Sequence, residues 1–75
     1  MVAGDIWEVQ PADGSGWIVR RAGAPESEST LHSSIEEAIE HARKLARDER
    51  GEARVKDRGG RIAERWTFGD FGYPI

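Results

Sequence analysis

Histidine is the first residue type in this chain that could do chemistry. His32 and His41 lie nine positions apart, and the chain contains no cysteine. A protein metal site usually needs three or four convergent side-chain ligands, so two histidines predict no metal site. Glu37 precedes His41 by four positions, which indicates an ion pair on a helix surface or plain exposure of the imidazole.

The carboxylates and serines show no catalytic pattern. The acidic candidates are spread over expected strands and turns, at Glu8, Asp13, Asp57 and Glu64. A catalytic pair must instead converge in a cleft. Ser15 lies between two expected strands, whereas a nucleophile elbow joins a strand to a helix. The sequence therefore predicts no enzyme, no cofactor and no small-molecule substrate.

Basic residues provide the strongest nucleic-acid signal. Five of them gather within 12 residues of the second half, at Arg54, Lys56, Arg58, Arg61 and Arg65. A β-ribbon that carries cations can read a DNA groove or follow a phosphate backbone. The charge of the whole chain disfavours binding of a polyanion, because the net charge is -3 and residues 1–40 hold eight acidic but only two basic side chains.

Aromatic residues provide the other candidate site. Trp7, Trp17 and Trp66 fall one to each of three expected strands, and we expect Trp17 and Trp66 in the core. Trp7 exceeds what one small core needs, as do Phe71 and Tyr73 of the tail. Apolar groups at an edge or tail often mark a contact with another chain. These three are the predicted partner-binding residues, and docking of the tail onto its own sheet is the equal alternative.

A single helix is expected from Ser34 to about Arg50. Ser34 and Glu37 have the spacing of a capping box. Apolar residues follow at helical spacing, at Ile35, Ala38, Ile39, Ala42, Leu45 and Ala46. We expect Gly51 to supply the left-handed residue that stops the helix.

Short strands account for most of the remaining chain. We expect strands at 5–11 and 17–20 joined by a glycine-rich turn, a weaker edge-like strand at 28–32, and strands at 52–56 and 61–68. In the last strand, alternation places Ile62, Glu64 and Trp66 on one face, and Gly60 is expected at positive φ in the turn before it. The pattern predicts a two-layer α+β fold, with an antiparallel sheet of four to five strands packed on one α-helix in the order β-β-(β)-α-β-β.

Length and composition limit the class of protein. Seventy-five residues predict one small domain over 1–75, for which dimerisation is a reasonable way to enlarge the core. No apolar run approaches the roughly 20 residues of a membrane span, and the first residues lack the pattern of a signal peptide. The lack of cysteine suits a reducing compartment. We therefore expect a cytoplasmic protein without a membrane segment.

The order of several short motifs resembles a known family. The motifs are Trp17 with Val19, residues 34–39, 51–55, 57–62 and 67–69, and Pro74 near the end. Together they resemble the DUF2188 family of small uncharacterised bacterial proteins from about Trp7 to Pro74. Ser34 and Ala53 depart from that pattern, which favours threonine and a larger apolar residue. The resemblance implies a small α+β domain and transfers no functional residues.

Two functions remain open from the sequence. The favoured one is a non-enzymatic binding module, which uses the sheet face away from the helix and the aromatic tail. Its partner would be another protein or a second copy of the chain in a homodimer. The alternative is nucleic-acid binding through the basic second hairpin.

Overall fold

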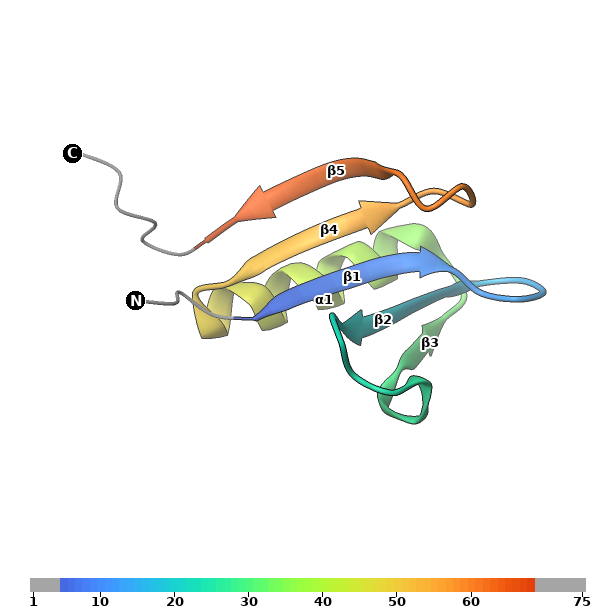
Figure 1. Cartoon of the computed structure of the whole chain (residues 1–75), viewed down its shortest axis with the longest axis horizontal. Coiled ribbons are helices and arrows are strands. Elements are labelled where there is room, and N and C mark those ends of the chain that lie inside the picture. The colour runs from blue at the N-terminus through green and yellow to red at the C-terminus, as the bar shows by residue number, and fades with distance from the viewer. Residues whose placement is uncertain (1–4, 69–75) are drawn as a thin grey trace.

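Five strands and one α-helix form two layers in the computed structural model, which describes residues 5–68 (Figure 1). The elements in chain order are β1 (Ile6–Pro11), β2 (Trp17–Arg21), the short 3-10 helix η1 (Glu26–Glu28), β3 (Thr30–His32), α1 (Ile35–Glu49), β4 (Glu52–Lys56) and β5 (Ile62–Thr67). The strand order is β3-β2-β1-β4-β5, and α1 covers one face of the sheet. The predicted α+β fold is confirmed, and so is the third strand within 28–32.

The two central strands, β1 and β4, run parallel. Trp7 lies opposite Ala53, and Val9 lies opposite Val55. The other three strand pairs are antiparallel, so the sheet is mixed rather than antiparallel throughout. Parallel neighbours need a crossover connection, and here α1 carries the chain back along the sheet before β4 begins.

Helix α1 begins at the predicted cap. Ser34 is extended, and its Oγ accepts a hydrogen bond of 3.2 Å from the backbone N–H of Glu37. The carboxylate of Glu37 lies 3.5 Å from the hydroxyl of Ser33. The first half of the capping box is therefore present, since the side chain of Ser34 satisfies one of the free N–H groups at the helix start.

The left-handed residue at the end of α1 is Arg50, with φ 56° and ψ 40°. The expectation that Gly51 would take this conformation was wrong by one position. Gly51 is required for a different reason, because an added Cβ would lie 2.0 Å from the carbonyl oxygen of Asp5. Its N–H donates to Ala46 O at 2.7 Å and its carbonyl accepts from Phe68 N at 2.9 Å. Gly51 thus lies where α1, β1 and the end of β5 meet.

Three alanines of α1 face the sheet. Ala38, Ala42 and Ala46 are fully buried, together with Val9 and Val19. Short side chains at four-residue spacing let a helix lie close to a sheet. Larger apolar side chains pack around this centre and are partly buried: Trp7, Trp17, Ile35, Ile39, Leu45, Trp66 and Phe68. The expected core positions of Trp17 and Trp66 are confirmed.

A β-bulge between β4 and β5 reverses the expected side of Ile62. Val55 pairs with Glu64, but the next residue, Lys56, pairs with Ile62, so Ala63 is the extra residue. Ile62 consequently lies on the same face as Lys56, which is the face away from α1, and is 41% exposed. Gly60 in the preceding turn has φ 83°, as expected.

Candidate functional site

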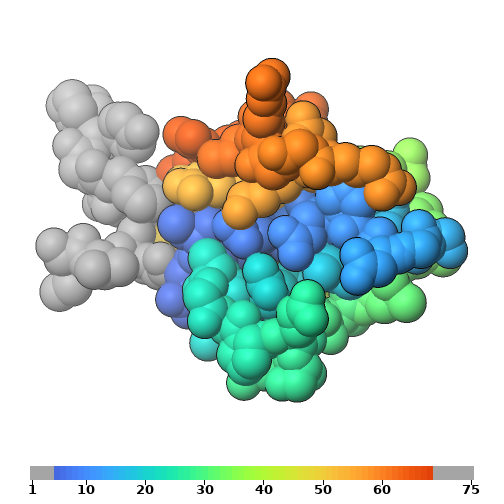
Figure 2. Space-filling model, turned by 45° about the vertical axis from the view of Figure 1, so that its right-hand side comes forward, coloured from blue at the N-terminus to red at the C-terminus, as the bar shows by residue number. Residues whose placement is uncertain are grey.

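Alternate residues of all five strands form the sheet surface that α1 does not cover. Because successive side chains of a strand point to opposite faces, the buried Val9, Val19 and Val55 assign their neighbours to the other side. This surface, which we call the open face, comprises Ile6, Glu8, Gln10, Ile18, Arg20, Leu31, Glu52, Arg54, Lys56, Ile62, Arg65 and Thr67. In the space-filling view, atoms of β1, β2 and the β4–β5 hairpin lie side by side on this side of the molecule (Figure 2).

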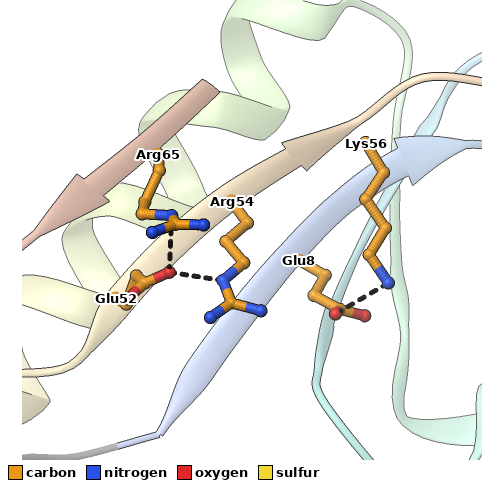
Figure 3. A network of polar contacts seen from close by, with 5 residues as sticks. All are labelled: Glu8, Glu52, Arg54, Lys56 and Arg65. Atoms are coloured by element: carbon orange, nitrogen blue, oxygen red, sulfur yellow. Dashed lines mark hydrogen bonds and ion pairs between the residues drawn. The ribbon is translucent and has the colours of Figure 1, made fainter. Parts of the chain in front are cut away.

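Glu52 joins two arginines on the open face. Arg54 and Arg65 lie directly opposite each other on β4 and β5, a position in which like charges repel. The carboxylate of Glu52 accepts a hydrogen bond from Nε of Arg54 and lies 3.3 Å from Nε of Arg65 (Figure 3). The side chain of Glu52 is only 13% exposed, so one largely buried anion serves two cations.

A second carboxylate lies at the centre of the sheet. Glu8 on β1 is buried, and its Oε2 lies 2.9 Å from Nζ of Lys56 (Figure 3). The strand register places Arg20 of β2 opposite Glu8 on one side and Arg54 of β4 opposite it on the other. Surrounding cations explain why a carboxylate can be buried here without a large desolvation penalty.

Positive charge is in excess on the open face. Its four cations, which we call the open-face cations, are Arg20, Arg54, Lys56 and Arg65, and its only carboxylates are Glu8 and Glu52. Within residues 5–68, Arg20 has no carboxylate partner, and its Nε has no hydrogen-bond acceptor. The open face is therefore cationic, although the chain has a net charge of -3.

The structure brings together three of the five residues predicted for nucleic-acid binding. Arg54, Lys56 and Arg65 lie on the open face. Arg58 and Arg61 belong to the β4–β5 turn, where Oδ1 of Asp57 accepts hydrogen bonds from Gly59 N at 2.9 Å and Arg61 N at 3.0 Å. The sequence reasoning missed Arg20, Glu8 and Glu52. Alternation along each strand could have found them, because the neighbours of the apolar Val9, Val19 and Val55 point to the opposite face of the sheet.

Trp7 lies on the helix side of the sheet. Its Nε1 donates a hydrogen bond of 3.1 Å to Oε1 of Glu49, and the guanidinium of Arg21 lies 5.0 Å from its ring centroid. Arg21 also contacts Asp5 at 3.1 Å and Glu49 at 3.5 Å. The open face is thus built without Trp7. The other two predicted partner-binding residues, Phe71 and Tyr73, lie outside the described residues, so the role of these three stays a prediction.

The sequence matches a family described as "Uncharacterized protein conserved in bacteria (DUF2188)" over residues 7–68. The chain belongs to this family. The resemblance that the motifs indicated is therefore confirmed. No curated protein and no solved structure matches the chain. The matched span includes every residue of the open face except Ile6, so this surface is part of the DUF2188 region itself.

The two histidines of this DUF2188 chain form a pair that links β3 to α1. Nε2 of His32 lies 2.9 Å from Nδ1 of His41, with the rings edge to face. One of these two nitrogens must donate and the other accept, so one proton lies between them. Burial lowers the pKa of His41 below 6.5, and His32 and Lys44 lower it further. The imidazole of His41 is half-buried and pairs with His32, so neither the expected ion pair with Glu37 nor the alternative of plain exposure describes it.

The surface of the DUF2188 region also contains recesses that are open to solvent. One of about 670 Å³ lies beside the histidine pair, and its lining includes Glu37, Glu40 and Lys44. Another of about 260 Å³ lies between the β1–β2 loop and the β4–β5 turn. Within residues 5–68, no three metal-ligating side chains converge. No helix in that range is long and apolar enough to cross a membrane.

Proposed function

We propose that this chain is a non-enzymatic protein-binding module of the cytoplasm, and that its partner docks on the open face. The observation that carries this proposal is the arrangement of the two layers. One face of the sheet is packed against α1. Within residues 5–68 no α-helix and no second sheet covers the other face, which the η1 segment borders where Glu26 and Ser29 line a recess with Gln10 and Ile18 (Figure 1). An uncovered face of five strands is large enough to serve as a docking surface, which a single short edge is not.

The composition of the open face suits a protein partner. Leu31 and Ile62 are 64% and 41% exposed and lie on its two outermost strands. Between them lie ion pairs that include the shared carboxylate of Glu52. Protein interfaces combine apolar contacts with hydrogen bonds and charged groups in this way. A partner can match such a pattern group by group.

The recesses support a binding role rather than a catalytic one. Both are open to solvent, and the recess beside the histidine pair lies on the helix side of the molecule. An active site must exclude water around the reacting groups and hold acid and base groups in place. An open surface recess offers little of this shelter.

Nucleic-acid binding is the second candidate, favoured by the common orientation of Arg54, Lys56 and Arg65. Two observations weigh against it. All three tryptophans pack on the helix side, and the chain is acidic overall. Stacking of bases on aromatic side chains, a main source of affinity for single strands, is therefore not offered by the open face.

Site-specific photo-crosslinking in bacterial cells tests the proposed function. A photoreactive amino acid is introduced at Leu31 or at Ile62, and as a control at Lys44 on the exposed side of α1. We expect protein adducts from the two open-face positions that the control does not give. Sedimentation of the purified chain then tells whether the partner is a second copy. Equal adducts from all three positions, or adducts only from Lys44, would contradict the proposal.

A further inference from the structure

We propose that the open face binds an extended acidic segment of its partner protein, with carboxylates of that segment contacting the open-face cations. The inference rests on the proposed function and adds the chemistry of the partner. Complementary charge is the reason for choosing this occupant. Four cations and two carboxylates leave the surface with two positive charges that no carboxylate of the open face balances.

The register aligns the charged groups in one row across the sheet. Arg20 of β2 lies opposite Glu8 of β1, Glu8 lies opposite Arg54 of β4, and Arg54 lies opposite Arg65 of β5. Neighbouring strands are about 4.8 Å apart, so Arg20 and Arg54 are separated by about 10 Å and the whole row spans about 14 Å. Five residues of an extended peptide cover a similar length, because the rise per residue is about 3.3 Å.

Arg54 and Arg65 retain free hydrogen-bond donors. Each contacts Glu52 through Nε, while a guanidinium carries five N–H donors in all. The salt bridges of both arginines with Glu52 are formed at Nε (Figure 3). A carboxylate from the partner can bind the terminal N–H groups in the bidentate geometry that guanidinium favours. Glu52 meanwhile holds both side chains in place.

The row of charged side chains across the sheet suits a peptide better than a nucleic acid. Glu8 lies in the middle of the row, between Arg20 and Arg54. A nucleic acid carries a negative charge at every nucleotide and would place one of these charges near the buried carboxylate of Glu8. A peptide can place a neutral or donating side chain there and keep its carboxylates for the arginines. Mixed charges therefore favour a protein segment over a uniform polyanion.

Fluorescence anisotropy with defined probes tests the inference. The probes are a labelled ten-residue peptide of alternating Glu and Ser, its Gln–Ser counterpart, a 20-base-pair DNA duplex and a single-stranded RNA. They are titrated with the full chain at 50 and 500 mM NaCl. Arg54→Gln removes one open-face cation, and Lys44→Gln is the matched control on the exposed side of α1. Circular dichroism verifies that both variants fold.

We expect the Glu–Ser peptide to bind at low salt, more tightly than the other three probes, and to be released at high salt. Arg54→Gln should weaken this binding about three- to fivefold, the range of one charge pair near a surface. Lys44→Gln should change it less than twofold.

Three results would overturn the inference. The first is equal weakening by both variants, and the second is no binding of the acidic peptide. The third is tighter binding of DNA or RNA that Arg54→Gln abolishes, which would favour the nucleic-acid alternative. If the acidic peptide fails but Leu31 and Ile62 still crosslink a protein, the charge argument is wrong and the proposed function stands. If both experiments fail, the open face is not a docking surface.

Discussion

Arg54 and Arg65 lie directly opposite each other on β4 and β5, and the carboxylate of Glu52 contacts Nε of both. Two like charges at opposite positions of an antiparallel pair destabilise it. The hairpin therefore depends on an anion that is itself mostly buried. This arrangement explains why a strand pair with so many cations folds, and why its surface remains positively charged afterwards.

The charge of Glu52 should matter for stability. We expect Glu52→Gln to lower the free energy of unfolding by about 1 kcal/mol at low salt, because Arg54 and Arg65 then repel without a counter-charge. The loss should shrink at 500 mM NaCl as salt screens the repulsion. Urea unfolding at two salt concentrations measures both effects. Glu64→Gln is the control, since Glu64 has no salt bridge within residues 5–68. Equal losses in the two variants would contradict the role of Glu52.

Glu8 and Lys56 form the most buried ion pair of the open face. We expect Lys56→Met alone to destabilise the fold by roughly 1–3 kcal/mol, because it leaves a buried carboxylate with one cation fewer. The double variant Glu8→Gln/Lys56→Met should recover part of that loss, since no uncompensated charge is then buried. A double-mutant cycle from urea unfolding measures the coupling. Strictly additive losses would show that the two side chains do not interact.

Protonation of His41 should reduce stability at mildly acidic pH. The pKa of His41 is lowered in the folded state by burial, His32 and Lys44, so the unfolded chain binds the proton more readily. Stability from this group is complete above about pH 6.5 and is lost as the pH falls from there towards the lower folded pKa.

Urea unfolding between pH 7.5 and 5.5 measures this dependence. Most carboxylates keep their charge over that range, and the slope expected here is that of His41. His41→Gln should flatten the curve, whereas Glu40→Gln should leave its slope unchanged. A slope that persists in His41→Gln would contradict this account of the pair.

Gly51 should not tolerate a side chain. In Gly51→Ala the added Cβ would meet the carbonyl oxygen of Asp5 at 2.0 Å, so the start of β1 or the end of α1 must move. We expect a loss of at least about 1–3 kcal/mol, the range for overpacking a well-packed site. Gly59→Ala is the matched control, because its nearest contact would be 3.4 Å from Oδ1 of Asp57. Thermal unfolding separates the two variants, and similar melting temperatures would show that the contact near Asp5 relaxes without cost.

Periodicity predicted the local elements well because it depends on side chains close in the sequence. The alanine and isoleucine spacing located α1, and Ser34 located its first residue. The parallel pairing of β1 and β4 was not predictable in this way, since it depends on where α1 returns the chain. The side of Ile62 was missed because one bulge residue, Ala63, shifts the alternation that the prediction relied on.

The candidate site was only partly visible in the sequence. The basic residues of the second hairpin stood out, and Glu52 lies in that same hairpin, whereas Glu8 and Arg20 come from β1 and β2 and join the row of charges through the register. The hydrogen bond between His32 and His41 likewise joins two elements whose contact no local pattern encodes. Sequence periodicity does not predict contacts between residues that are distant along the chain.

The most direct test of the central claim is NMR detection of the arginine Nε–H signals during titration with the Glu–Ser peptide. The chain offers an internal control, since Arg43 and Arg47 of α1 lie over Trp66 and Phe68 on the helix side. If the open face is the docking surface, the signals of Arg20, Arg54 and Arg65 shift as peptide is added, and those of Arg43 and Arg47 do not. Shifts confined to Arg43 and Arg47, or equal shifts in both groups, would contradict the account.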